Sequence, residues 1–299
     1  MTTTTDRWLA SIANPNTRRQ YAAGLASFMA HAGLASDDQL TDAAPRQVRA
    51  WLNTLRESGA SPATVNSRRA AIAAFYRFAE TAEGWSANPA AKIHTARVTA
   101  YGRSSYPTTD QVRTLLAAIP ATPAGQRDLA IILGMYATTR RIAEWLPLRW
   151  CDIQQAGWFT YTAKGGDVCR QAIPNDLWQV IVAQAEAFNR WPLLRDQHLF
   201  VSGRGQPLSA GYIRLAIKRY GKIAGLPANV CHPHGLRHAG ARARRAAGQS
   251  PWELQEVLSH KNIQTTMIYA HRVLDEPVDA VGNSIVSAVL PAPRRPDSR

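Results

Sequence analysis

The residues of this chain that could do chemistry lie in three short stretches and beside one predicted turn. Arg141 lies within Tyr136–Trp150, the second stretch is His234-Gly-Leu-Arg237-His238, and the third runs from Leu258 to His271. Lys164 precedes two glycines between two strand-like segments. Together they supply permanent cations, proton carriers and a hydroxyl nucleophile: Arg141, Lys164, His234, Arg237, His260 and Tyr269. Such a set could bind an anion, attack it and move protons.

A phosphodiester suits this set of side chains. Its nonbridging oxygens repel a nucleophile, so cleavage without a metal needs fixed cations, a nucleophile and an acid for the leaving oxygen. Arg141 and Arg237 can each donate two hydrogen bonds to phosphate, and His260 can donate one. Tyr269 can form a covalent phosphoester. That ester would keep the energy of the broken bond for rejoining, so we expect no cofactor and no metal.

The histidine cluster before residue 240 has a second interpretation. His234, Arg237 and His238 fall on one face of a helix start, where three donors could meet one phosphate. Cys231 and His232 could instead join the two histidines in a zinc site. The spacing fits no standard zinc finger, and an arginine in the middle would repel a cation. The sequence therefore favours an anion site, with His238 as a secondary, structural hydrogen-bonding residue.

The motifs, taken in this order and in a strongly basic chain, resemble the tyrosine recombinase (phage integrase) family. Residues from 106 onward resemble its catalytic domain, and the basic N-terminal helices with their closing Asn88-Pro89 resemble its core-binding domain. The resemblance implies an N-terminal helical core-binding (SAM-like) domain followed by an α+β tyrosine recombinase catalytic domain. The expected fold is therefore mainly α with a small β-sheet.

The chain departs from the family pattern at two places. The family usually has Gly-Leu where this chain has Thr139-Arg140, and Leu-Gly-His where this chain has Leu258-Ser-His260. The register of the residues that follow selects Arg141 as the catalytic arginine, which leaves Arg140 as an additional DNA or structural contact. Glu144 lies three residues after Arg141, so it could orient that guanidinium or form an ordinary helix ion pair.

The resemblance also implies a role for each site residue. Tyr269 attacks the scissile phosphate and leaves a 3′-phosphotyrosyl DNA with a free 5′-hydroxyl. Lys164 protonates the departing 5′ oxygen, and His234 assists proton transfer at the tyrosine. The cations that hold the phosphorane are Arg141, Arg237 and His260. For an isolated tyrosine a place in the core is the ordinary interpretation, but Tyr269 follows His260 at the interval that the family motif leads one to expect.

The N-terminal residues 1–93 predict a bundle of short amphipathic helices. One helix is capped by Asn16 or Thr17 and ends at Gly33, a second starts near residues 42–45, and a third begins at Ser61-Pro62. The third helix carries arginines that could contact DNA or form a solvated face: Arg68, Arg69 and Arg77. Residues 94–106 have no helical period and predict a linker.

Residues 107–290 predict the catalytic domain. A helix capped by Thr108 or Thr109 and an apolar helix through residues 129–136 lead to a hairpin. The two strands of that hairpin cover residues 158–162 and 168–173, joined by a Gly165-Gly166 turn. Residues 277–290 predict a short amphipathic helix, which in the family docks on a neighbouring protomer and otherwise would pack on its own domain. Residues 291–299 predict a disordered tail.

Composition limits the partners. The chain has 35 Lys and Arg against 21 Asp and Glu, a net charge of +14, so a polyanion partner is expected. Three separate cysteines exclude a disulfide framework. There is no run of 18 apolar residues and no secretory signal, so we expect no membrane partner and a cytoplasmic, nucleoid-associated protein.

Three functions fit these patterns. The first is site-specific recombination on double-stranded DNA through a Holliday junction. It would require a homo-tetramer on two DNA sites, and the protein could be a monomer without DNA. The second is a type IB topoisomerase, which cuts one strand with the same residues. The third is a catalytically idle DNA-binding relative, against which the complete residue set argues. The absence of a preceding arm-binding domain favours an Xer-like or mobile-element enzyme, and the sequence does not identify accessory recombination proteins.

Overall fold

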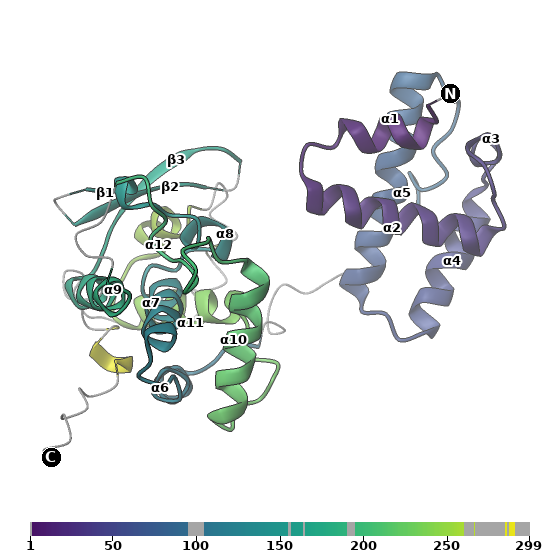
Figure 1. The fold of residues 1–299 in the computed structure, drawn as a ribbon. Coiled ribbons are helices and arrows are strands. Elements are labelled where there is room, and N and C mark those ends of the chain that lie inside the picture. Colours follow the sequence, from purple (N-terminus) through teal and green to yellow (C-terminus); the bar gives the residue numbers. More distant parts are fainter. Residues whose placement is uncertain are drawn as a thin grey trace, which may run out of the picture. The chain divides into compact units, whose positions relative to one another are not determined.

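The computed structural model describes residues 2–94, 105–154, 157–163, 165–189 and 195–259, together with residues 266, 285 and 287–290. The chain divides into two compact units, residues 1–99 and 100–299 (Figure 1). Each unit has its own cluster of buried apolar side chains. Among the described residues, no helix is both long and apolar enough to cross a membrane.

The N-terminal unit is helical. Its helices are α1 (Thr4–Ser11), α2 (Pro15–Ala32), α3 (Asp37–Leu40), α4 (Pro45–Glu57) and α5 (Pro62–Glu83). The three helices predicted from the sequence are confirmed, and Gly33 ends α2 with a φ of 67°. The predicted cap of α2 is wrong. Asn14 is the cap, because its side chain accepts hydrogen bonds from the backbone N–H groups of Asn16 and Thr17, and Pro15 then starts the helix.

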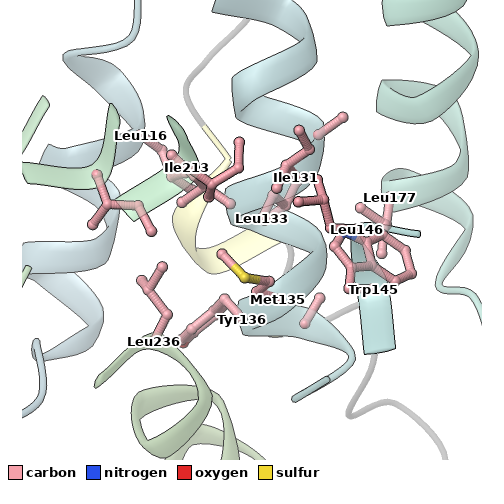
Figure 2. Packing of buried hydrophobic residues seen from close by; sticks show 14 of the residues in the cluster. Leu116, Ile131, Leu133, Met135, Tyr136, Trp145, Leu146, Leu177, Ile213 and Leu236 are labelled. Atoms are coloured by element: carbon pink, nitrogen blue, oxygen red, sulfur yellow. The ribbon is translucent and has the colours of Figure 1, made fainter. Parts of the chain in front are cut away.

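The C-terminal unit is built around α7 (Pro123–Ala137). All residues from Ala130 to Ala137 are buried, because this stretch is apolar all round and other helices of the unit pack around it. Figure 2 shows Leu133, Met135 and Tyr136 among the packed side chains. Around it pack α6 (Thr109–Ala117), α9 (Asn175–Ala187), α10 (Ala210–Ile223) and α11 (Pro233–Ala246). The remaining helices are α8 (Ile142–Trp145), the 3-10 helix η1 (Trp150–Asp152) and α12 (Pro251–Leu258).

A three-stranded antiparallel sheet lies at one end of this unit (Figure 1). Its order is β1 (Ile153–Gln154), β2 (Trp158–Thr162) and β3 (Val168–Ala172). The predicted hairpin is confirmed, and Gly165 and Gly166 both have the positive φ that its turn requires. Strand β1 was not predicted, because two residues are too few to show an alternating pattern.

The described end of the predicted C-terminal helix packs on its own unit. Ile285 and Val289 are buried in the same apolar cluster as α7. Arg113 of α6 donates a hydrogen bond to the carbonyl of Ala288, and Ser287 donates one to Asp176 of α9. These contacts favour the second of the two interpretations given for residues 277–290. The predicted tail, residues 291–299, lies outside the described residues.

Candidate active site

The loop between α7 and α8 carries Arg141 and positions it at the start of α8. Glu144 accepts two hydrogen bonds from Arg141, one from the backbone N–H at 2.9 Å and one from Nη1 at 2.7 Å. The carboxylate therefore caps the helix and fixes the guanidinium at once, so both interpretations of Glu144 hold. The Arg141 side chain keeps about a third of its surface exposed.

Glu144 is a buried carboxylate shared by three arginines. Besides Arg141, its Oε2 lies 3.7 Å from Nη1 of Arg237 and 3.9 Å from Nη1 of Arg140. Burial alone would raise the pKa of Glu144, but the hydrogen bonds from Arg141 and the charges of Arg140 and Arg141 hold that pKa below its usual value. Glu144 is therefore ionised at neutral pH and offsets part of the positive charge of the site.

Arg237 reaches the same place from α11. Its Nη1 donates to the carbonyl of Thr139 at 2.6 Å and its Nη2 to the carbonyl of Leu258 at 2.8 Å. The α11 helix can approach α7 this closely because residue 240 is glycine, and a Cβ there would overlap the carbonyl oxygen of Tyr136. Two backbone carbonyls and one carboxylate thus hold the Arg237 guanidinium in a single place.

His234 lies in the first turn of α11, where its ring is partly shielded by its neighbours but keeps part of its surface exposed. Its Nε2 lies 2.8 Å from Nε2 of His238, so one ring donates and the other accepts. Desolvation, followed by the charges of Arg237, His232 and Arg141, lowers the pKa of His234. The neutral imidazole that results at pH 7 is the form that can accept a proton.

The geometry does not support the zinc interpretation. The His232 ring caps α11 by accepting the N–H of Gly235, and its other nitrogen lies 3.1 Å from the carbonyl of Ser105. Cys231 is buried against Gly221. Within the described part of the chain, no three His, Cys, Asp or Glu side chains are grouped as metal ligands.

Arg141, His234 and Arg237 line one surface pocket of about 500 Å³. Two further cations line it, Arg214 and Lys218, both on the exposed face of α10. Neither residue was predicted from the sequence. Their spacing of four residues on an amphipathic helix was the available signal, since it places both on one face. The pocket therefore gathers positive charge from α8, α10 and α11.

A buried network fixes α10 to the central helix. Asp128 of α7 is fully buried and accepts hydrogen bonds from the hydroxyls of Tyr212 and Tyr220 on α10. Arg127 compensates its charge, with Nη2 at 2.7 Å from the carboxylate. The two α10 cations that line the pocket are thus carried on a rigidly anchored helix.

The other predicted residues have different surroundings. Arg140 is completely buried, which favours a structural over a DNA contact. Arg69 donates to the carbonyls of Ala90 and Ala91, Arg68 is half-buried beside Gly24, and Arg77 is exposed. Three predicted site residues lie outside the described residues: Lys164, His260 and Tyr269.

Comparison with known families decides the identity of this fold. Residues 106–275 match the model of the phage integrase family, and residues 7–83 match that of its N-terminal SAM-like domain. The chain belongs to the phage integrase family. The expectation drawn from the motifs is confirmed at this level, and so is the mainly α fold with a small sheet.

Relatives and solved structures agree with this family membership. A tyrosine recombinase XerC of Corynebacterium efficiens is 30% identical, over 78% of this chain and 74% of its own length. A XerC of Actinobacillus pleuropneumoniae is 28% identical, over 86% of this chain and 82% of its own length. A lambda integrase fragment, residues 75–356 bound as a dimer to a core site, superposes with a TM-score of 0.74 over 92% of this chain and 97% of that one, at 20% identity. The XerH recombinase bound to difH has a TM-score of 0.68 over 85% of this chain and 76% of its own, at 19% identity. At these identities the two structures establish the fold.

Proposed function

We propose that this member of the phage integrase family cuts and rejoins double-stranded DNA at specific sites through a phosphotyrosine on Tyr269. The observation that carries the proposal is the pocket in which Arg141, His234 and Arg237 meet from two helices. A scissile phosphate placed there would face two permanent cations and a proton acceptor. The names of the relatives support the same activity, because the curated XerC and XerD proteins are tyrosine recombinases.

The arginines stabilise charge that develops during the reaction. As the Tyr269 oxygen bonds to phosphorus, negative charge builds on the nonbridging oxygens, and Arg141 and Arg237 donate to them. Both guanidiniums are already fixed, Arg141 by Glu144 and Arg237 by the carbonyls of Thr139 and Leu258. Little reorganisation is then needed in the transition state.

Each proton in the reaction has a donor and an acceptor. The Tyr269 hydroxyl gives its proton to His234 as the tyrosyl–phosphorus bond forms. The bond from phosphorus to the 5′ oxygen breaks, and Lys164 protonates that oxygen. His260 donates to the phosphorane. The 5′-hydroxyl of a partner strand then gives its proton to the neutral Lys164 and attacks the phosphotyrosine. The bond from phosphorus to the Tyr269 oxygen breaks, and protonated His234 returns its proton to that oxygen, so the DNA is rejoined without ATP.

Recombination by this route needs four protomers on two DNA sites, because four strands are exchanged through a Holliday junction. A lambda integrase of the same fold has been solved as a tetramer bound to a Holliday junction. We place Arg214 and Lys218 on the DNA backbone next to the scissile phosphate, since both line the pocket. The core-binding unit would supply further DNA contacts, and the exposed Arg77 of α5 is the leading candidate for one of them.

The test is formation of a covalent adduct. Purified protein is mixed, without metal or ATP, with DNA fragments that flank its own gene, and SDS-resistant complexes are digested for mass spectrometry. A nucleotide on Tyr269, absent from Tyr269→Phe and retained in the matched control Tyr21→Phe, supports the proposal. An adduct on another tyrosine overturns the site assignment. Tight binding without any adduct supports the idle DNA-binding relative.

A supercoiled plasmid separates recombination from simple relaxation. The wild-type protein should leave a plasmid without its site supercoiled and should join two fragments that carry the site. Relaxation of the plasmid that lacks the site would support the topoisomerase alternative instead.

A further inference from the structure

Arg140 is a completely buried arginine that contacts residues from three elements. Its Nη1 donates to the hydroxyl of Ser259 at 3.2 Å and lies 3.9 Å from the Glu144 carboxylate. Its guanidinium carbon lies 4.3 Å from the centre of the Tyr161 ring on β2. A buried arginine without such partners would be strongly unfavourable. These contacts therefore join the loop between α7 and α8, the sheet and the end of α12.

Ser259 needs those contacts because of its backbone conformation. It ends α12 with a φ of 51° and a ψ of 47°, the left-handed region that favours glycine. A residue with a Cβ pays roughly 1 kcal/mol or more in this region. Its hydroxyl lies 2.7 Å from the Tyr161 hydroxyl and accepts from Arg140. The two hydrogen bonds offset the strain and lock the turn.

The locked turn is connected to a catalytic side chain. The residue before Ser259 is Leu258, whose carbonyl accepts the hydrogen bond from Nη2 of Arg237. The direction of that carbonyl depends on the turn that follows it. Arg237 is also linked to the Arg140 segment directly, because its Nη1 donates to the carbonyl of Thr139 and both guanidiniums lie within 4 Å of Oε2 of Glu144. A change at Arg140 can thus reach Arg237 by way of the Ser259 turn.

We propose that Arg140 is a positioning residue for Arg237: its buried guanidinium holds the Ser259 turn, and this turn aims the Leu258 carbonyl that orients Arg237. The inference rests on the proposed function for the role of Arg237. The chain departs from the family pattern at Thr139-Arg140 and at Ser259, and the proposal links the two departures because Arg140 contacts Ser259. Because Arg140 is fully buried, it acts on the rate of the chemical step and not on DNA binding.

The first experiment compares Arg140→Leu, Ser259→Gly and the double variant. Arg140→Leu should slow adduct formation at saturating DNA by about 10- to 100-fold, because a displaced catalytic cation is costly. The Kd for DNA should stay within about twofold, because no phosphate contact is lost. In the double variant, glycine adopts the left-handed turn without a partner, so most of the lost rate should return. Ser259→Gly alone should change the rate by less than about threefold.

A second pair approaches the same contact from the turn. Ser259→Ala keeps the Cβ and the strain but loses the hydroxyl, so it should be slower than Ser259→Gly. This pair leaves Arg140 in place and tests the inference even if Arg140→Leu does not fold. A rate for Ser259→Ala equal to that of Ser259→Gly would overturn it. So would a double variant as slow as Arg140→Leu, or a Kd that rises in step with the loss of rate.

Urea unfolding supplies a readout that does not depend on recombination. The shifts in unfolding midpoint from Arg140→Leu and Ser259→Gly should be non-additive, because the two side chains touch. Arg244→Leu is the matched control: Arg244 is also buried, but its guanidinium donates to the carbonyl of Ala137 and to Gln249 instead of Ser259. Its shift should add to that of Ser259→Gly. Additive shifts for both pairs would overturn the inference. If wild-type protein forms no adduct, the proposed function fails. The unfolding shifts of the single and double variants still show whether Arg140 stabilises the Ser259 turn.

Discussion

Replacing Glu144 by glutamine removes the carboxylate that three arginines share. Its oxygens lie 2.7 Å from Arg141, 3.7 Å from Arg237 and 3.9 Å from Arg140. One such pair near 3.8 Å is worth at most about 4 kcal/mol at an effective dielectric constant of about 20. Desolvation cancels part of this, and removing one partner of a buried ion pair costs about 3–5 kcal/mol in practice. We expect Glu144→Gln to destabilise the protein by about 3 kcal/mol.

Calorimetry of the full chain measures this loss. For a unit of this size, about 3 kcal/mol corresponds to a melting temperature lower by about 6–12 °C. The matched control is Glu186→Gln, an exposed glutamate on α9 of the same unit, which should leave the melting temperature within about 2 °C because surface charges contribute little. Adduct formation should also slow in Glu144→Gln, since Arg141 loses its fixed partner.

The pH dependence tests the physical reason. The folded-state pKa of Glu144 lies below its usual value of 4.5, so its contribution to stability is fully present above about pH 4.5 and is lost as the pH falls through the folded pKa. The stability difference between wild type and Glu144→Gln should therefore be constant from pH 7 to about pH 5 and shrink below about pH 4.5. A difference that stays the same down to pH 3 would refute the ionised carboxylate.

Three further predictions follow from the site and its support. The lowered pKa of His234 predicts an acidic limb in the rate of adduct formation below pH 6.5, which His234→Gln should abolish; a limb that persists in the variant would assign it to another group. Arg214→Ala and Lys218→Ala should each reduce the slope of log Kd against log salt by about one, measured by fluorescence anisotropy, because each would lose a phosphate contact; an unchanged slope would remove that side chain from the DNA surface. Gly134→Ala should destabilise by about 1–3 kcal/mol in urea, because its Cβ would overlap the ring of Trp145, and a more stable variant would contradict the packing of α7 against α8.

Local sequence patterns predicted the elements whose start or turn is marked by a few neighbouring residues. Ser61-Pro62 marked the start of α5, and Gly165-Gly166 marked the hairpin turn. Of the two caps predicted for α6, Thr108 and Thr109, Thr108 is the one found. In each case the signal is a short-range hydrogen bond or a backbone preference. Strand β1 was missed because it lacks such a signal. Strand β1 has two residues and depends on pairing with β2.

The candidate site was predictable in part for a different reason. Arg141, His234 and Arg237 were identified because their chemistry and order along the chain match a known pattern, not because any local rule brings α8 and α11 together. The burial of Arg140 could not be foreseen, since an arginine beside another arginine is ordinarily exposed. Its contacts with Tyr161, Ser259 and Glu144 make its burial possible.

The pocket holds its cations together before any DNA arrives, and the balance of charges explains how. Among the described residues its lining includes no carboxylate, yet Arg141, Arg214, Lys218 and Arg237 converge on it, and such cations repel one another. Glu144 lowers this repulsion without being part of that lining, because it is buried and its oxygens lie close to Arg141 and Arg237. A carboxylate in the lining would stabilise the free protein better and would also repel the DNA. Because the compensating carboxylate is buried outside the lining, it keeps the arginines fixed and leaves part of their positive charge uncompensated. The phosphate of the DNA neutralises this remaining charge on binding, and the same charge stabilises the transition state.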